Sequence, residues 1–141
     1  MNEPEITLRR LGYDDECWRA EVCASNGLFV ATFAFYTHPT ELEPFAQSLI
    51  TFPRDIHDEA RFEQGQPKEP TYYLLIRAFL YDGSGHSAIE FSARGHSSER
   101  FSPSSRFFIL AEASALNRLG QQLLRWLEHA DEPLSWKPRN A

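Results

Sequence analysis

The sequence contains little cysteine: of its 141 residues, only Cys17 and Cys23 are cysteines. If both lie on one strand, the rise of about 3.3 Å per residue holds them about 20 Å apart. A disulfide needs Cα atoms within about 7 Å of each other, so these thiols can neither pair within the chain nor share a metal ion. Reduced thiols are typical of the cytoplasm, where we expect the protein.

Long hydrophobic runs are also lacking. No apolar run approaches the roughly 20 residues of a membrane-spanning helix, and the first ten residues show no pattern of a signal peptide. An apolar content of 42%, with eleven Phe, is typical of a globular chain with a substantial core. The length fits one domain over residues 1–141.

Basic charge is scarce in the first half of the chain. The net charge is −6, and residues 1–70 carry thirteen acids against six bases, whereas residues 71–141 carry seven acids against eight bases. A protein that follows a phosphate backbone presents a net basic face. The composition therefore predicts no nucleic-acid partner and favours either a basic protein partner or solubility alone.

Two hairpins are the clearest local signals. Asn26-Gly27 is typical of a type I′ turn, which aligns apolar residues across the first hairpin. The expected pairs on the core face are Ala24 with Phe29, Val22 with Ala31, Ala20 with Phe33, and Trp18 with Phe35. On the other face, Arg19 is expected opposite Ala34 and Cys17 opposite Tyr36. The second hairpin surrounds a four-residue loop, Asp82–Gly85. Its expected pairs are Ile76 with Phe91, Ala78 with Ile89 and Leu74 with Ala93 on the core face, and Arg77 with Glu90 on the other.

The remaining segments predict two strands and two helices. Residues 6–11 favour an edge strand and residues 107–111 a further strand, while a Thr40/Glu43 capping box opens a helix that ends before Pro53. Apolar residues at helical spacing predict a second helix over 114–129. Residues 54–70 favour a long exposed loop with a helical turn around 58–63. The sequence thus predicts an α+β fold, with an antiparallel sheet of five to six strands covered on one face by two amphipathic helices.

Catalytic and metal-binding patterns are weak. Asp82 and His86 flank a glycine-rich loop and could perform acid–base chemistry, but a hairpin loop needs the same Asp and Gly for its turn geometry. None of the five histidines has the spacing of a metal-chelating pair. We therefore expect no metal and no cofactor, and an enzyme is less favoured than a binding protein.

The face of the sheet that points away from the helices is the predicted binding surface. Aromatic residues and arginine are enriched at protein interfaces, and this face collects Tyr73, Arg77, Phe79, Tyr81, Glu90 and Arg94. Val30, Thr32 and Tyr36 of the first hairpin are expected on the same face. The alternative is that residues 54–70 or the C-terminal tail with Trp136 cover it. The predicted partner is another protein or a second copy of the chain.

A pattern of turn and core residues spans most of the chain. It comprises Gly27 before a Phe-rich strand, the helix with Leu42, Phe45 and Leu49, Asp82-Gly83 with Gly85-His86, and Leu119, Gln122 and Leu123 in the closing helix. This order resembles small, largely uncharacterised bacterial domains of the immunity-protein-like class. The resemblance implies an antiparallel α+β domain that binds a partner stoichiometrically, and it supplies no catalytic residue.

The resulting hypothesis is a non-enzymatic protein-binding domain that acts through the exposed sheet face as an immunity-type inhibitor. Two alternatives stay open. One is a small enzyme with His86 and Asp82 at the mouth of a pocket. The other is a binder of a small apolar ligand between helices and sheet, although the dense Phe pattern favours a filled core.

Overall fold

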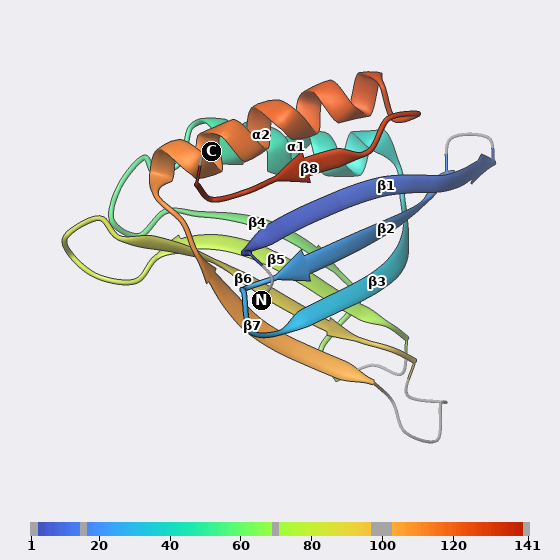
Figure 1. Ribbon diagram of the computed structural model, residues 1–141, viewed down its shortest axis with the longest axis horizontal. Coiled ribbons are helices and arrows are strands. Elements are labelled where there is room, and N and C mark those ends of the chain that lie inside the picture. The colour runs from blue at the N-terminus through green and yellow to red at the C-terminus, as the bar shows by residue number, and fades with distance from the viewer. Residues whose placement is uncertain (1–2, 15–16, 69–70, 97–102, 140–141) are drawn as a thin grey trace.

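Two four-stranded antiparallel sheets and two helices form the fold in a computed structural model, which describes residues 3–14, 17–68, 71–96 and 103–139 (Figure 1). Sheet A has the strand order β3-β2-β1-β8 and sheet B the order β4-β5-β6-β7. The elements are β1 (Glu5–Asp14), β2 (Cys17–Ser25), β3 (Val30–Thr37), α1 (Pro39–Ile50), β4 (Glu59–Gln64), β5 (Tyr73–Leu80), β6 (Ser87–Arg94), β7 (Ser104–Leu110), α2 (Ala113–Glu128) and β8 (Leu134–Trp136).

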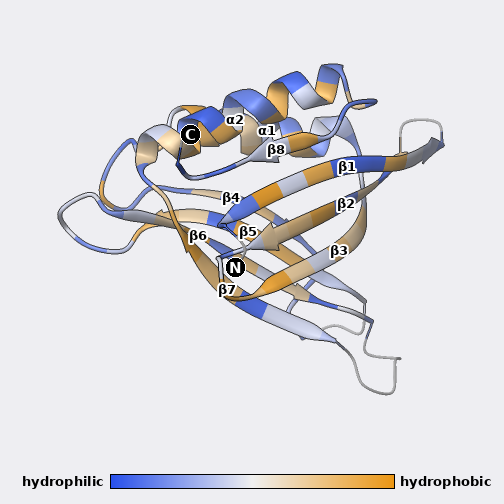
Figure 2. Cartoon of the chain, viewed as in Figure 1, coloured by the Kyte–Doolittle hydropathy of each residue, from blue (hydrophilic) through white to orange (hydrophobic). Residues whose placement is uncertain are grey.

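One hydrophobic core joins both sheets and both helices. In Figure 1, β1–β3 lie in front of β4–β7, and the helices run along one side of the two sheets. Alternate residues of each strand point inward, and the buried side chains of the two sheets belong to a single cluster that includes Val22, Phe35, Phe91 and Ile109. Figure 2 shows this alternation of polar and apolar residues along β1. Each sheet therefore keeps one outer face for solvent.

Helix α2 closes the core because its small and polar residues fit against α1. A side chain at Gly120 would place its Cβ only 2.6 Å from the carbonyl oxygen of Ala46, so glycine permits the close contact between the helices. The side-chain amide of Asn117 donates to the carbonyls of Leu49 at 2.9 Å and Phe52 at 2.8 Å. These bonds satisfy backbone carbonyl groups at the C-terminal end of α1, which have no hydrogen-bond partner within the helix. Neither helix described is long and apolar enough to cross a membrane.

The prediction for the second hairpin is confirmed. Strands β5 and β6 pair Ile76 with Phe91 and Arg77 with Glu90, as the turn at residues 82–85 requires. The backbone N–H of Tyr81 donates to the carbonyl of His86 at 2.9 Å and closes that loop. Because Ile76 and Phe91 are buried, the predicted core face of this hairpin is also correct.

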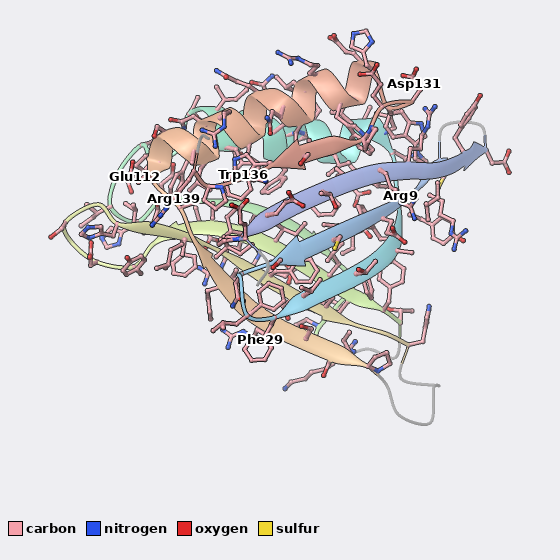
Figure 3. All side chains as sticks on the ribbon, in the orientation of Figure 1. Arg9, Phe29, Glu112, Asp131, Trp136 and Arg139 are labelled. Atoms are coloured by element: carbon pink, nitrogen blue, oxygen red, sulfur yellow. The ribbon has the colours of Figure 1, made fainter. Side chains whose placement is uncertain are left out.

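The first hairpin has a different register from the predicted one. Strands β2 and β3 pair Ala24 with Ala31, Val22 with Phe33, Ala20 with Phe35 and Trp18 with Thr37. The turn spans four residues, because the side chain of Asn26 accepts hydrogen bonds from the N–H groups of Leu28 at 2.9 Å and Phe29 at 2.8 Å. Phe29 is consequently 64% exposed at the turn instead of buried (Figure 3). The shift of two residues keeps every strand residue on its predicted face.

The predicted single sheet of five to six strands is wrong in detail, because the structure has two sheets of four strands each. Residues 59–64 form strand β4, not a loop with a helical turn, because Ala60 and Phe62 bury their side chains while the charged residues between them point outward. Strand β1 lies between β2 and β8 and is not an edge strand. An α+β fold built on antiparallel sheets is confirmed.

The predicted capping box does not form. Helix α1 begins at Pro39, with His38 as its N-cap and no side-chain cap. Thr37 instead donates its hydroxyl to Glu41 at 3.0 Å. Proline fits the first helical position because its missing N–H would have no partner within the helix. Helix α2, at Ala113–Glu128, agrees with the predicted span within one residue at each end.

Candidate functional site

The outer face of sheet B is the predicted binding surface, and most of its charges are engaged within the sheet. Arg77 and Phe79 are half-buried and Tyr81 is 50% exposed, whereas Tyr73 is buried at 8% exposure. The guanidinium of Arg77 lies 4.1 Å from the centre of the Phe79 ring. The aromatic side chains of this face therefore pack mainly against its own charged residues.

Glu90 is the centre of that network. Its side chain is almost buried, and its carboxylate accepts hydrogen bonds from Arg77 Nε at 2.9 Å and Arg106 Nε at 2.8 Å. Burial alone would raise the pKa of Glu90, but the hydrogen bonds from Arg106 and Arg77 outweigh it and the pKa lies below its ordinary value. Arg77 also reaches Glu59 at 3.2 Å. Two arginines are thus committed to carboxylates.

The segment between β4 and β5 covers one end of this face. Arg94 donates to the carbonyls of Thr71, at 3.0 Å, and of Pro67. The hydroxyl of Tyr73 donates to Glu63 at 2.6 Å, and burial is the main reason that its pKa rises to about 12. The C-terminal tail does not reach this face, because Trp136 lies in β8, buried beneath α2, and its ring N–H donates to Ala115 at 2.8 Å (Figure 3).

The Asp82–His86 pair lies on an exposed hairpin loop. His86 Nδ1 is 2.6 Å from Asp82 Oδ2, and Asp82 Oδ1 accepts from the backbone N–H of Ser84 at 2.9 Å. Hydrogen bonds from His86 lower the pKa of Asp82. The pair thus serves the turn geometry, and no third polar side chain joins it from a separate segment of the described chain. No group of three or more potential metal ligands occurs among the residues described.

A groove on the outer side of sheet A offers a different chemistry. It has a volume of about 930 Å³ and lies where β1 turns into β2, next to the end of β3. Its lining residues are Gly12, Tyr13, Asp14, Cys17, Arg19, Tyr36 and His38. We call it the sheet A groove.

The floor of the sheet A groove is one row of residues across three strands. Gly12 of β1 pairs with Arg19 of β2, which pairs with Tyr36 of β3. A side chain at Gly12 would meet no atom within 4 Å, so this position leaves open space in the row. Toward the turn, Tyr13 pairs with Trp18 and then Asp14 pairs with Cys17. The glycine therefore leaves open space at one end of the row, next to Arg19, and Tyr36 lies at the other end.

The aromatic rings and arginines of this region are available to a ligand. Tyr13 is 68% exposed and Tyr36 is 57% exposed. The guanidinium of Arg10 lies 4.5 Å from the ring centre of Tyr13 and 5.0 Å from that of Trp18. Among the ion pairs of the described residues, neither Arg10 nor Arg19 has a carboxylate partner. Their charge is accordingly uncompensated by any ion pair.

Side chains from sheet B hold the backbone of Tyr36 in place. The hydroxyl of Tyr72 accepts from the Tyr36 N–H at 3.2 Å and donates to Gln64 at 2.8 Å. The amide of Gln64 in turn donates to the Tyr36 carbonyl at 2.6 Å and to Glu41 at 3.1 Å. This arrangement, which we call the Tyr36 clamp, joins the edge strands of the two sheets. It fixes the position of an exposed tyrosine before any ligand arrives.

The sequence did not identify the sheet A groove because the predicted register was wrong. That register placed Arg19 opposite Ala34 and Tyr36 opposite Cys17, and it assigned Tyr36 to the same outer surface as β5 and β6. The two-residue shift places Arg19 directly beside Tyr36, on a separate sheet. The signal available in the sequence was two arginines in hairpin strands without an acid across from them.

Comparison with known proteins finds the fold among solved structures only. No protein-family model and no curated protein matches the sequence. WHY3 from Arabidopsis thaliana superposes with a TM-score of 0.51 at 10% identity, over 92% of this chain and 85% of that one. WHY1 from the same plant gives 0.50 at 13% identity, over 93% and 87%. A structure described as the plant transcriptional regulator PBF-2 gives 0.46 at 12% identity, over 92% and 82%.

These structural neighbours overturn two predictions. WHY3 and WHY1 are plant proteins and neither is described as an immunity protein, so the predicted immunity-type, protein-binding function is wrong. The predicted exclusion of nucleic acid is also wrong in the light of these two structures. The physical reason is that net charge averages over the whole surface. The chain carries twenty acids, but among the described residues that line the sheet A groove the carboxylate is Asp14.

Proposed function

We propose that the protein binds single-stranded nucleic acid in the sheet A groove, with bases stacked on Tyr36 and on Tyr13 at the rim, and a phosphate close to Arg19. The observation that carries the proposal is a groove lined by two exposed tyrosines, in which Arg19 lies beside Tyr36 without a carboxylate partner and Gly12 leaves open space. The cytoplasmic location stays a prediction.

Stacking supplies most of the expected affinity. A base on an aromatic side chain contributes about 1–3 kcal/mol, and every base has a face that can stack. Gly12, Arg19 and Tyr36 lie side by side on β1, β2 and β3. A base stacked on the Tyr36 ring can therefore lie beside Arg19, with open space over Gly12. In a duplex both faces of each base are already stacked, so the rings favour single strands.

The arginines supply a smaller, salt-dependent contribution. Each phosphate contact releases condensed counterions, by about 0.7 per contact on single strands. Asp14 is the carboxylate among the groove residues, and it lies toward the turn, two pairs beyond Arg19. The row of Gly12, Arg19 and Tyr36 itself contains no acid. A protein of net charge −6 can therefore bind a polyanion locally.

Fluorescence anisotropy with a labelled single-stranded oligonucleotide tests the proposal. The double variant Tyr13→Ala/Tyr36→Ala is expected to bind about 100-fold more weakly, because it removes two stacking positions. Tyr81→Ala is the matched control, since Tyr81 is a 50% exposed tyrosine on the other sheet. An affinity equal to that of a duplex of the same sequence, or equal losses in both variants, would contradict the proposal.

A further inference from the structure

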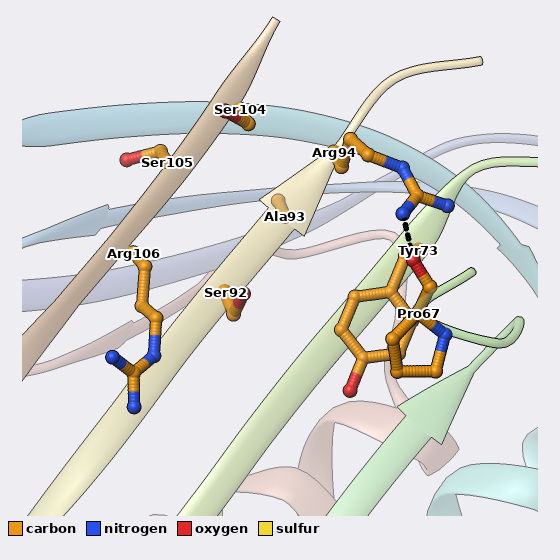
Figure 4. Close-up of a pocket in the computed structure, with 8 residues that line it drawn as sticks. All are labelled: Pro67, Tyr73, Ser92, Ala93, Arg94, Ser104, Ser105 and Arg106. Carbon is orange, nitrogen blue, oxygen red and sulfur yellow. Dashed lines mark hydrogen bonds between the residues drawn. The ribbon is translucent and has the colours of Figure 1, made fainter. Parts of the chain in front are cut away.

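A second pocket lies on the outer face of sheet B, away from the sheet A groove. It has a volume of about 280 Å³, and Figure 4 shows the residues that line it on three neighbouring strands, with Pro67 beside Tyr73 and Arg94. Ser92 of β6 pairs with Arg106 of β7, and Arg94 of β6 pairs with Ser104 of β7. Hydroxyl and guanidinium groups therefore alternate across two neighbouring strands, with Tyr73 of β5 beside them. We call it the serine–arginine pocket.

Several donors of this pocket are free to bind a ligand. Within the described residues, the hydroxyls of Ser92 and Ser104 make no hydrogen bond, and Arg106 uses only its Nε, toward Glu90. Arg94 is oriented at the rim by its bonds to backbone carbonyls, one of them that of Pro67 (Figure 4). Two hydroxyls and one half-used guanidinium thus surround the same small space.

The local charge balance favours an anion. The outer face of sheet B carries four arginines, at positions 61, 77, 94 and 106, against three glutamates, at 59, 63 and 90. The two glutamates nearest the pocket are already neutralised. Glu63 accepts from Arg61 at 3.1 Å and from Tyr73, and Glu90 accepts from two arginines.

We infer that the serine–arginine pocket binds a phosphate group, through the hydroxyls of Ser92 and Ser104 and the free nitrogens of Arg106. A tetrahedral oxyanion offers acceptors in several directions, and a guanidinium matches two of its oxygens at once. The volume exceeds that of a single phosphate, so the pocket also has room for the first atoms of a phosphomonoester. This site is independent of the proposed function, because it lies on the opposite side of the molecule.

An NMR titration of the ¹⁵N-labelled protein with inorganic phosphate tests this inference, with chloride keeping the ionic strength constant. We expect saturable shifts of the amides of Ser92, Arg94, Ser104 and Arg106. The double variant Ser92→Ala/Ser104→Ala is expected to weaken binding about fivefold or more, because it removes two hydrogen bonds. Ser135→Ala, a substitution of an exposed strand serine on sheet A, is the control and should leave the affinity unchanged.

Two further ligands distinguish the source of the phosphate. Tighter binding of adenosine monophosphate than of phosphate would support the site and identify its ligand as a phosphomonoester. No saturation at about 50 mM phosphate, unchanged affinity in the double serine variant, or shifts with an oligonucleotide alone would each overturn the inference. A negative phosphate titration does not affect the proposal for the sheet A groove, because the test of that proposal relies on Tyr13 and Tyr36.

Discussion

The outer faces of the two sheets carry the same residue types and use them differently. On sheet B, Arg77 and Arg106 are both bound to the nearly buried Glu90. On sheet A, Arg9 is paired with Glu21, but Arg19 on the same face has no such partner among the described residues. Arginine and aromatic content alone therefore does not identify a binding face. What matters is whether the charges are already compensated.

Replacement of Glu90 is expected to give the largest effect that separates the two faces. Glu90→Gln leaves Arg77 and Arg106 without their carboxylate, and because Arg106 is largely exposed the loss of unfolding free energy should be about 2 kcal/mol. Urea denaturation measures this loss. Oligonucleotide affinity of the folded variant should stay within about twofold of the wild type, and a large affinity loss would show that sheet B contributes to the binding site.

Removal of one uncompensated arginine should have an intermediate effect. Arg19→Ala is expected to weaken oligonucleotide binding about fivefold and to reduce the slope of log affinity against log salt by about 0.7, the value for one phosphate contact. Anisotropy at several salt concentrations measures both quantities. Arg9→Ala is the matched control, because Arg9 lies on the neighbouring strand but is paired with Glu21 at 2.8 Å. Equal slopes for the two variants would remove Arg19 from the site.

Acid should weaken the stabilisation by Glu90. Its folded-state pKa lies below the ordinary value of 4.5, so its contribution is present above that pH and is lost as the pH falls through the folded pKa. Denaturation curves from pH 7 to about pH 3 should therefore show a shrinking difference between wild type and Glu90→Gln. A difference that stays constant over this range would mean that the pKa of Glu90 is not lowered.

The smallest expected effect concerns the Tyr36 clamp. Tyr72→Phe removes the hydroxyl that binds the Tyr36 N–H and Gln64, while the ring keeps its contact with Phe33. We expect about a twofold loss of oligonucleotide affinity, because Tyr36 is held less firmly. Tyr73→Phe is the control, since its hydroxyl binds Glu63 on sheet B. An equal change in both variants would assign no positioning role to Tyr72.

The sequence predicted those parts of the fold that depend on local chemistry. The turn at residues 82–85 and the Arg77–Glu90 pair select one register, and the structure has it. Asn26-Gly27 allows both a two-residue and a four-residue turn, and both keep the same residues inward. The apolar pattern of β2 and β3 therefore could not distinguish the two registers.

The elements that were missed depend on contacts distant in sequence. Half of the residues of strand β4 are charged, and the alternation of charged and apolar residues is meaningful only beside β5, where Arg77 contacts Glu59. Strand β8 has three residues and pairs with β1 across almost the whole chain. Because the sequence does not show which hairpins share a sheet, Tyr36 was predicted on the same face as Tyr81.

The most direct test of the central claim is to map where a single-stranded oligonucleotide contacts the protein by NMR shifts of the ¹⁵N-labelled chain. We expect the amides of Gly12, Arg19 and Tyr36 to shift most and those of Arg77 and Phe79 to keep their positions. Shifts centred on β5 and β6, or no shifts at saturating oligonucleotide, would contradict the claim.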